Sequence, residues 1–162
     1  MKTWWARIHR RWLALRRLRN LRLVWLFLRV ACFAATVPIL MRFKLPAING
    51  LRPDFVLAGG DLVSDEAEDS YRRLQALLAP LAAPIHLLMG NHDSRAAYRR
   101  VFHPGVPATD EPVCGAFERA GVRFVLTDST LPGKEEGELS PSQLAWLEAE
   151  LVAHPGRPTW VF

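Results

Sequence analysis

The sequence contains few cysteines and no internal repeat or low-complexity segment. Cys32 and Cys114 are the only two in 162 residues, and they lie in regions of different composition without metal-ligand spacing. This pattern argues against a disulfide framework and against a zinc ribbon. With 50% hydrophobic and 23% charged residues, the composition is that of an ordinary globular domain.

Acidic residues are absent from residues 1–44, which carry nine Arg and two Lys. Residues 45–162 carry ten Lys and Arg against sixteen Asp and Glu, so the net charge of +5 arises from the N-terminal segment alone. We therefore predict a basic, apolar N-terminal segment over residues 1–44 and a globular domain over residues 45–162.

The N-terminal segment has the pattern of a basic amphipathic helix, because Trp5, Ile8, Trp12 and Leu15 recur at helical spacing among arginines. Such a helix would lie on an anionic membrane. The interleaved Trp and Leu favour this membrane contact over nucleic-acid binding. A non-native reading frame, indicated by the change in charge near Lys44, stays open as a second interpretation.

Residues 23–41 are almost all apolar and are near the lower limit for a helix that spans a bilayer. The upstream arginines would then predict a cytoplasmic N-terminus. Arg29 and Pro38 weigh against a span, since a central Arg costs about 2.5–3.5 kcal/mol on insertion scales.

The globular domain alternates strand and helix patterns, which predicts an α/β fold. Strands are predicted over residues 53–58, 85–89, 113–117 and 122–127 and from residue 158, and helices begin near Asp65, at Asp93 or Ser94, and at Ser140. In the last helix we expect Leu144, Leu147 and Leu151 to form the buried stripe. Asp128 and Ser129 follow a strand, and we expect them to form a turn.

Two short motifs follow apolar strands: Gly60-Asp61, and Gly90-Asn91-His92. Both lie at the carboxyl ends of successive strands, where open α/β sheets place their ligand sites. A carboxylate can bridge two metal ions, and a neutral amide oxygen leaves a metal electrophilic, so Asp61 and Asn91 are candidate metal ligands. His92 is a candidate proton donor to a leaving group, and Asp93 would orient its ring.

These residues resemble the calcineurin-like metallophosphoesterases, and in particular the cyclic-nucleotide and glycerophosphodiester phosphodiesterase branch. The likeness runs from about Ala47 to Phe162. It comprises Leu-Arg-Pro-Asp-Phe-Val-Leu-Ala-Gly-Gly-Asp-Leu-Val from residue 51, Pro-Ile-His-Leu-Leu-Met-Gly-Asn-His-Asp from residue 84, Phe-Val-Leu-Thr-Asp-Ser from residue 124, and Leu-Ser-Pro-Ser-Gln-Leu-Ala-Trp-Leu-Glu-Ala-Glu-Leu from residue 139.

The resemblance implies a partial layered αββα sandwich, in which a metal-dependent enzyme hydrolyses a small phosphodiester in the cytoplasm. Two metal ions, Mn, Fe, Zn or Co, would be the cofactors. Asp61 would bridge them, Asn91 would bind one metal and the substrate, and His92 would contact the substrate and assist departure of the alkoxide. The oligomeric state is not indicated.

The chain departs from the family pattern at two places. Family members carry an Asp-x-His motif upstream of Asp61, but residues 19–23 contain no acid and no histidine. They also carry histidines beyond the strand that begins at Pro158, and this sequence ends at Phe162. We therefore expect a truncated domain with part of a metal centre. A non-catalytic, membrane-associated remnant and a basic nucleic-acid-binding protein stay open as alternative functions.

Overall fold

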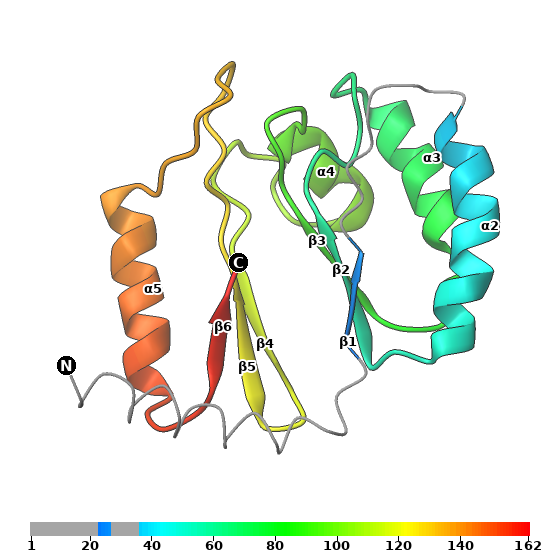
Figure 1. Cartoon of the computed structure of the whole chain (residues 1–162). Coiled ribbons are helices and arrows are strands. Elements are labelled where there is room, and N and C mark those ends of the chain that lie inside the picture. Colours follow the sequence, from blue (N-terminus) through cyan, green and yellow to red (C-terminus); the bar gives the residue numbers. More distant parts are fainter. Residues whose placement is uncertain (1–22, 27–35) are drawn as a thin grey trace.

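The structure is a computed structural model that describes residues 23–26 and 36–162, in which strands and helices largely alternate (Figure 1). The elements in chain order are β1 (Leu23–Leu26), α2 (Thr36–Leu51), β2 (Phe55–Gly59), α3 (Glu68–Leu78), β3 (Ile85–Leu88), α4 (Arg95–Phe102), β4 (Gly115–Arg119), β5 (Val122–Leu126), α5 (Pro141–Ala153) and β6 (Thr159–Val161).

The first sheet is parallel, in the order β1-β2-β3. Its central strand, β2, is buried on both faces, which explains its uninterrupted apolar sequence. Because side chains alternate along a strand, Phe55 and Leu57 point into one core, whereas Val56 and Ala58 point into others beside the helices.

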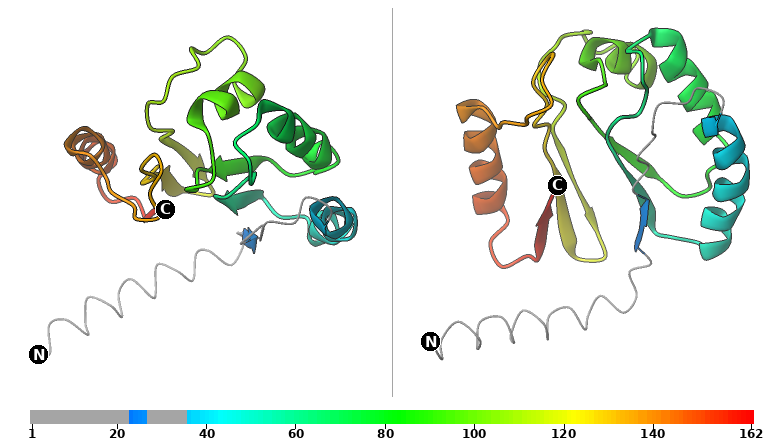
Figure 2. Two further views of the ribbon diagram at one scale, coloured as in Figure 1. Left: turned by 90° about the horizontal axis from the view of Figure 1, so that it is seen from above. Right: turned by 45° about the horizontal axis from the view of Figure 1, so that its top comes forward.

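The second sheet has the order β4-β5-β6, with β4 and β5 antiparallel and β6 parallel to β5. Phe124 on β5 packs edge-to-face against Phe55 on β2 at a centroid distance of 4.8 Å, so the two sheets lie face to face. Helices α2 and α3 cover the outer face of the first sheet, and α5 lies beside the second (Figures 1 and 2). The predicted αββα layering is therefore confirmed.

The described part of the N-terminal segment belongs to this sandwich. Strand β1 pairs with β2 over its whole length, and α2 packs against β2 through Leu45 and Ile48. The boundary predicted between residues 44 and 45 falls inside α2, where Pro46 also lies. The amphipathic helix predicted over residues 5–15 lies outside the described residues.

The apolar run over residues 23–41 does not form the single spanning helix predicted as one interpretation. Its first four residues are strand β1, and its last six begin α2. Among the described residues, no helix combines the length and the apolar content needed to cross a bilayer. A buried parallel strand and a membrane helix share the same apolar composition, which is why the sequence suggested the wrong element.

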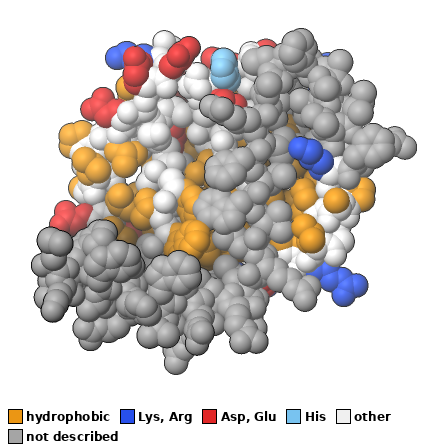
Figure 3. Space-filling view, in the orientation of Figure 1, with side chains coloured by type: hydrophobic (Ala, Val, Ile, Leu, Met, Phe, Trp, Pro, Cys, Tyr) orange, Lys and Arg blue, Asp and Glu red, His pale blue; other side chains and the backbone are white. Residues whose placement is uncertain are grey.

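The buried leucine stripe predicted for α5 is wrong. Leu144 is 51% exposed and Leu151 is 43% exposed, and hydrophobic side chains show on the side of the molecule where α5 lies (Figure 3). Gln143 is the buried side chain of this helix. Its amide nitrogen donates to the carbonyl oxygen of Asp128 at 2.6 Å, so a polar residue docks α5 near the end of β5.

Candidate functional site

The loops that follow β2 and β3 are in direct contact. A Cβ atom added to Gly90 would lie 2.1 Å from the backbone nitrogen of Asp61, and one added to Gly60 would lie 2.9 Å from the carbonyl oxygen of Met89. Both distances are shorter than any real contact of a Cβ atom, so glycine is required for this approach. The structure thus brings the two predicted motifs together at one edge of the first sheet.

Asp61 adopts an unusual backbone conformation at this junction. Its φ angle is +49°, in the left-handed region that non-glycine residues seldom occupy, and it follows Gly60 with φ +74°. The Oδ1 atom of Asp61 accepts a hydrogen bond from the backbone N–H of His92 at 3.4 Å. The half-buried carboxylate therefore lies against the turn that carries Asn91 and His92.

Asn91 and His92 are both exposed at this turn. Asn91 lies on the wall of a pocket of about 430 Å³, whereas Asp61 and His92 are not among the residues that line the pocket. Asp61, Asn91 and His92 therefore lie close together, and of the three Asn91 lines the pocket.

In this structure the carboxylate of Asp93 is hydrogen-bonded to groups other than the imidazole of His92. Its carboxylate accepts hydrogen bonds from the backbone N–H groups of Leu62, Val63 and Gly90 at 2.8–3.2 Å, and from the hydroxyl of Tyr71 at 2.9 Å. The described residues show no contact between this carboxylate and the imidazole of His92. Asp93 instead joins the loop after β2 to the loop after β3, and so fixes the positions of the backbone next to Asp61 and Asn91.

Burial raises the pKa of Asp93 above its usual range, against the effect of the N–H and hydroxyl donors that favour the carboxylate. Burial beside this carboxylate also raises the pKa of Tyr71. Tyr71 therefore remains a neutral donor to Asp93, and its oxygen accepts the N–H of Ser94 at 2.8 Å. The network fixes the start of α4, where Ser94 also caps the helix.

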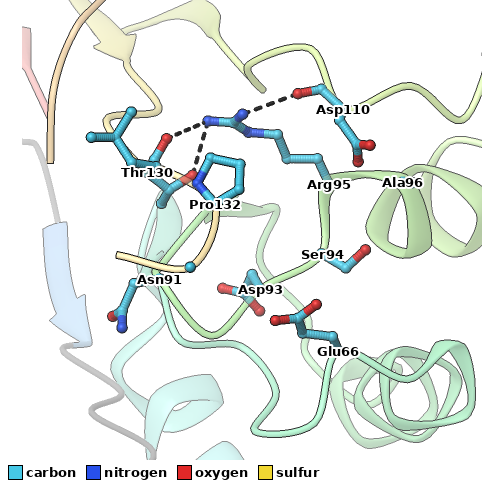
Figure 4. Close-up of a pocket in the computed structure, with 11 residues that line it drawn as sticks. Glu66, Asn91, Asp93, Ser94, Arg95, Ala96, Asp110, Thr130 and Pro132 are labelled. Carbon is cyan, nitrogen blue, oxygen red and sulfur yellow. Dashed lines mark hydrogen bonds between the residues drawn. The ribbon is translucent and has the colours of Figure 1, made fainter. Parts of the chain in front are cut away.

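The pocket is formed by loops from both sheets (Figure 4). Its wall includes Asn91 and Asp93 from the loop after β3 and residues 130–133 from the loop after β5. Glu66 and Asp110 add carboxylates, and Arg95 lies across the pocket from Asn91 in this view. The pocket therefore opens where the two sheets meet, beside the predicted metal ligands.

Sequence reasoning missed the ion pair that joins these loops, between Arg95 and Asp128. The Nε atom of Arg95 lies 2.7 Å from Oδ2 of Asp128, whose side chain is fully buried. Burial alone would raise the pKa of Asp128, but hydrogen bonds from Arg95 and Thr130 outweigh it and lower the pKa below the usual range. Asp128 lies just after β5, at the same edge as the other strand-end motifs, and this position in the sequence could have indicated a role at the site. We predicted only a turn there.

The described residues contain no complete set of ligands for a metal centre. Asp61 and Asn91 offer the oxygen donors that suit a divalent cation. Within residues 23–26 and 36–162, however, no group of three or more His, Cys, Asp or Glu side chains is close enough together to hold a metal ion. Phe27, Leu28 and Arg29, which follow β1 in the sequence, contain neither a carboxylate nor an imidazole.

Comparison with known proteins gives several related phosphodiesterases. A probable cyclic nucleotide phosphodiesterase of Rhodococcus erythropolis is 40% identical over 108 residues, which cover 64% of this chain and 36% of the relative. The glycerophosphodiester phosphodiesterase GpdQ of Enterobacter lignolyticus is 33% identical over 120 residues, which cover 71% of this chain and 43% of the relative. The 3',5'-cyclic adenosine monophosphate phosphodiesterase CpdA of Escherichia coli K12 is 35% identical over 118 residues, which cover 69% of this chain and 42% of the relative.

The chain thus spans less than half the length of each of these relatives. The family profile described as calcineurin-like phosphoesterase matches residues 8–153, which is most of the chain and includes much of the N-terminal segment. Together with the αββα layers and the adjoining Gly-Asp and Gly-Asn-His-Asp turns, this match shows that the chain belongs to the calcineurin-like phosphoesterase family.

Proposed function

We propose that the protein is a metal-dependent phosphodiester hydrolase whose site is built from Asp61, Asn91 and His92. The observation that carries the proposal is the contact between the two strand-end turns, in which the N–H of His92 donates to the carboxylate of Asp61. The pocket beside Asn91 gives the site room for a small ligand. Relatives named as cyclic-nucleotide and glycerophosphodiester phosphodiesterases support this class of substrate.

The roles follow from the chemistry of the three side chains. Asp61 and Asn91 would hold metal of the Mn, Fe, Zn or Co type, which supplies positive charge for the phosphoryl oxygens. The imidazole of His92, exposed at the turn, would donate a proton or a hydrogen bond to the leaving oxygen. One ester substituent of the substrate would occupy the pocket next to Asn91.

Hydrolysis of bis-p-nitrophenyl phosphate with Mn²⁺ tests this proposal. We expect turnover by the full chain and a loss of roughly 10²- to 10⁴-fold in His92→Ala, the range for a general acid. His154→Ala is the matched control, because His154 ends α5 close to the start of β6, at the opposite end of the strands from the site. Equal loss in both variants, or no turnover by the wild type, would contradict the proposal.

A second candidate, a non-catalytic phosphoester-binding protein, is favoured by one observation: the described residues supply an incomplete ligand set. Calorimetric titration with bis-p-nitrophenyl phosphate separates the two candidates. Binding without turnover supports the second, and binding with turnover supports the first.

We further propose that, of residues 1–44, the part that precedes β1 contacts an anionic membrane surface. The support is the charge of residues 1–22, which carry seven Arg and one Lys without an acid, together with the interleaved Trp and Leu. Co-sedimentation with vesicles containing phosphatidylserine is expected, and sedimentation should fall with salt because the attraction is electrostatic. Equal sedimentation with neutral vesicles would contradict the electrostatic part of this proposal.

A further inference from the structure

The guanidinium group of Arg95 has an acceptor for each of its nitrogens. Its Nε and one terminal nitrogen donate to the two carboxylate oxygens of Asp128 at 2.7 and 3.0 Å. The same terminal nitrogen donates to the carbonyl and hydroxyl oxygens of Thr130 at 2.7 and 2.9 Å, and the other donates to the carbonyl of Asp110 at 3.0 Å. Each nitrogen of the Arg95 guanidinium group is therefore engaged by an acceptor within the protein.

Asp128 is equally saturated. Besides Arg95, its carboxylate accepts the backbone N–H of Val113 at 2.8 Å, and both the N–H and the hydroxyl of Thr130 at 3.0 and 2.6 Å. The side chain of Asp128 has no exposure and that of Arg95 is 11% exposed. A bidentate pair with this burial holds a single geometry, because neither partner can turn to water.

The pair connects the two halves of the candidate site. Arg95 is the first residue of α4 and follows the Asn91–His92 turn, whereas Asp128 and Thr130 belong to the loop after β5. Asn91 and residues 130–133 both line the pocket. Arg95 therefore links the segment that follows Asn91 to the loop that carries residues 130–133.

We propose that Arg95 is a positioning residue for the phosphodiester site. Through its hydrogen bonds to Asp128 and Thr130 it fixes the Asn91–His92 turn relative to the loop after β5. This inference rests on the proposed function and adds to it the residue that holds the site together across the two sheets.

The test must separate positioning from stability. Removing Arg95 alone leaves a buried, unpaired carboxylate, which destabilises a protein strongly, whereas replacing both members of a buried pair by apolar residues is often neutral. We therefore compare Arg95→Met with the double variant Arg95→Met/Asp128→Leu. Arg100→Met is the control, because Arg100 lies on the same helix and its side chain is 49% exposed in an ion pair with Glu68.

We expect kcat/KM for bis-p-nitrophenyl phosphate to fall by roughly 10²-fold in the single and the double variant, the effect of a displacement of about 1 Å. The urea midpoint should recover toward the wild-type value in the double variant only. Arg95→Lys, which keeps one bond to Asp128, should retain part of the activity. Wild-type kcat/KM in the double variant would overturn the proposal.

Hydrogen–deuterium exchange gives a readout that needs no turnover. The amides of Gly90 and Asp93 are hydrogen-bonded within the turn, and the amide of His92 donates to the carboxylate of Asp61; none of these bonds involves Arg95. We expect these amides to exchange faster in the double variant than in the wild type or Arg100→Met. Unchanged exchange would overturn the proposal, even if absence of wild-type turnover has already refuted the proposed hydrolase.

Discussion

The carboxylate of Asp93 joins the two loops that carry the predicted metal ligands. Three backbone N–H groups and the hydroxyl of Tyr71 converge on its carboxylate. The N–H donors come from the loops that carry Asp61 and Asn91, and Tyr71 lies on α3, so the geometry of both predicted ligands depends on Asp93. The sequence could not reveal this, because Leu62 and Val63 are about thirty positions away along the chain.

Replacing Asp93 by alanine is therefore expected to lower the free energy of unfolding by about 3–5 kcal/mol, since each orphaned buried donor costs about 1–3 kcal/mol. Urea denaturation measures the change. Asp69→Ala is the matched control, because Asp69 is an exposed carboxylate of α3 with one long ion pair, and it should change stability by less than about 0.5 kcal/mol. A loss below about 1 kcal/mol for Asp93→Ala would contradict the assigned role.

The depressed pKa of Asp128 predicts a pH dependence of stability. A carboxyl group whose folded pKa lies below its unfolded value contributes stability above the unfolded pKa, and this contribution is lost as pH falls through the folded pKa. The difference in unfolding free energy between wild type and Asp128→Asn should thus be largest near neutral pH. It should shrink below about pH 4, where the unfolded carboxyl begins to protonate.

Urea titrations at pH 7 and pH 3 check this expectation. Asp69→Asn serves as the control, and its small difference from wild type should be nearly the same at both pH values. A difference for Asp128→Asn that grows on acidification would contradict the ion pair described here.

At the scale of elements, local signals predicted helix and strand positions well. The start of α5 at Pro141 is confirmed with its capping box, in which Ser140 and Gln143 satisfy each other's backbone N–H groups. The apolar runs predicted β2 and β3, and their ends gave the correct location for Asp61 and Asn91. These features depend only on residues within a few positions of each other, so they can be predicted from the sequence without knowing which distant elements pack together.

Whether a helix buries its apolar face, in contrast, cannot be predicted from local spacing alone. Leu74 on α3 and Leu144 on α5 belong to similar leucine stripes, yet Leu74 is 7% exposed and Leu144 is 51% exposed. Helical spacing defines a stripe, but the packing of distant elements decides whether anything covers it. This is why the prediction failed for α5, although a leucine of a similar stripe on α3 is buried.

These two leucines give a matched test. Leu74→Ala should lower the free energy of unfolding by about 2–5 kcal/mol, the usual cost of a cavity in a core. Leu144→Ala should change it by less than about 0.5 kcal/mol. Urea denaturation of both variants measures the contrast, and comparable losses would show that α5 buries its stripe after all.

At the scale of the whole molecule, the candidate site lies where the two sheets meet. The motifs after β2 and β3 come from the first sheet, and the residues that close the pocket come from the loop after β5. The αββα layers and the two motifs were predictable from the sequence and its family resemblance. The pocket and the Arg95–Asp128 pair were not, because that pair joins residues 33 positions apart.

Calorimetric titration of the full chain with Mn²⁺ tests most directly whether Asp61 and the Asn91–His92 turn form one metal-binding phosphodiester site. We predict that the wild type binds Mn²⁺ and that Asp61→Asn lowers the affinity roughly tenfold or more. Loss of a residue that only supports a metal ligand already costs about tenfold, and loss of the ligand itself should cost at least as much. Asp69→Asn should bind Mn²⁺ as the wild type does. Equal affinity in Asp61→Asn and wild type, or no binding by the wild type, would contradict the account.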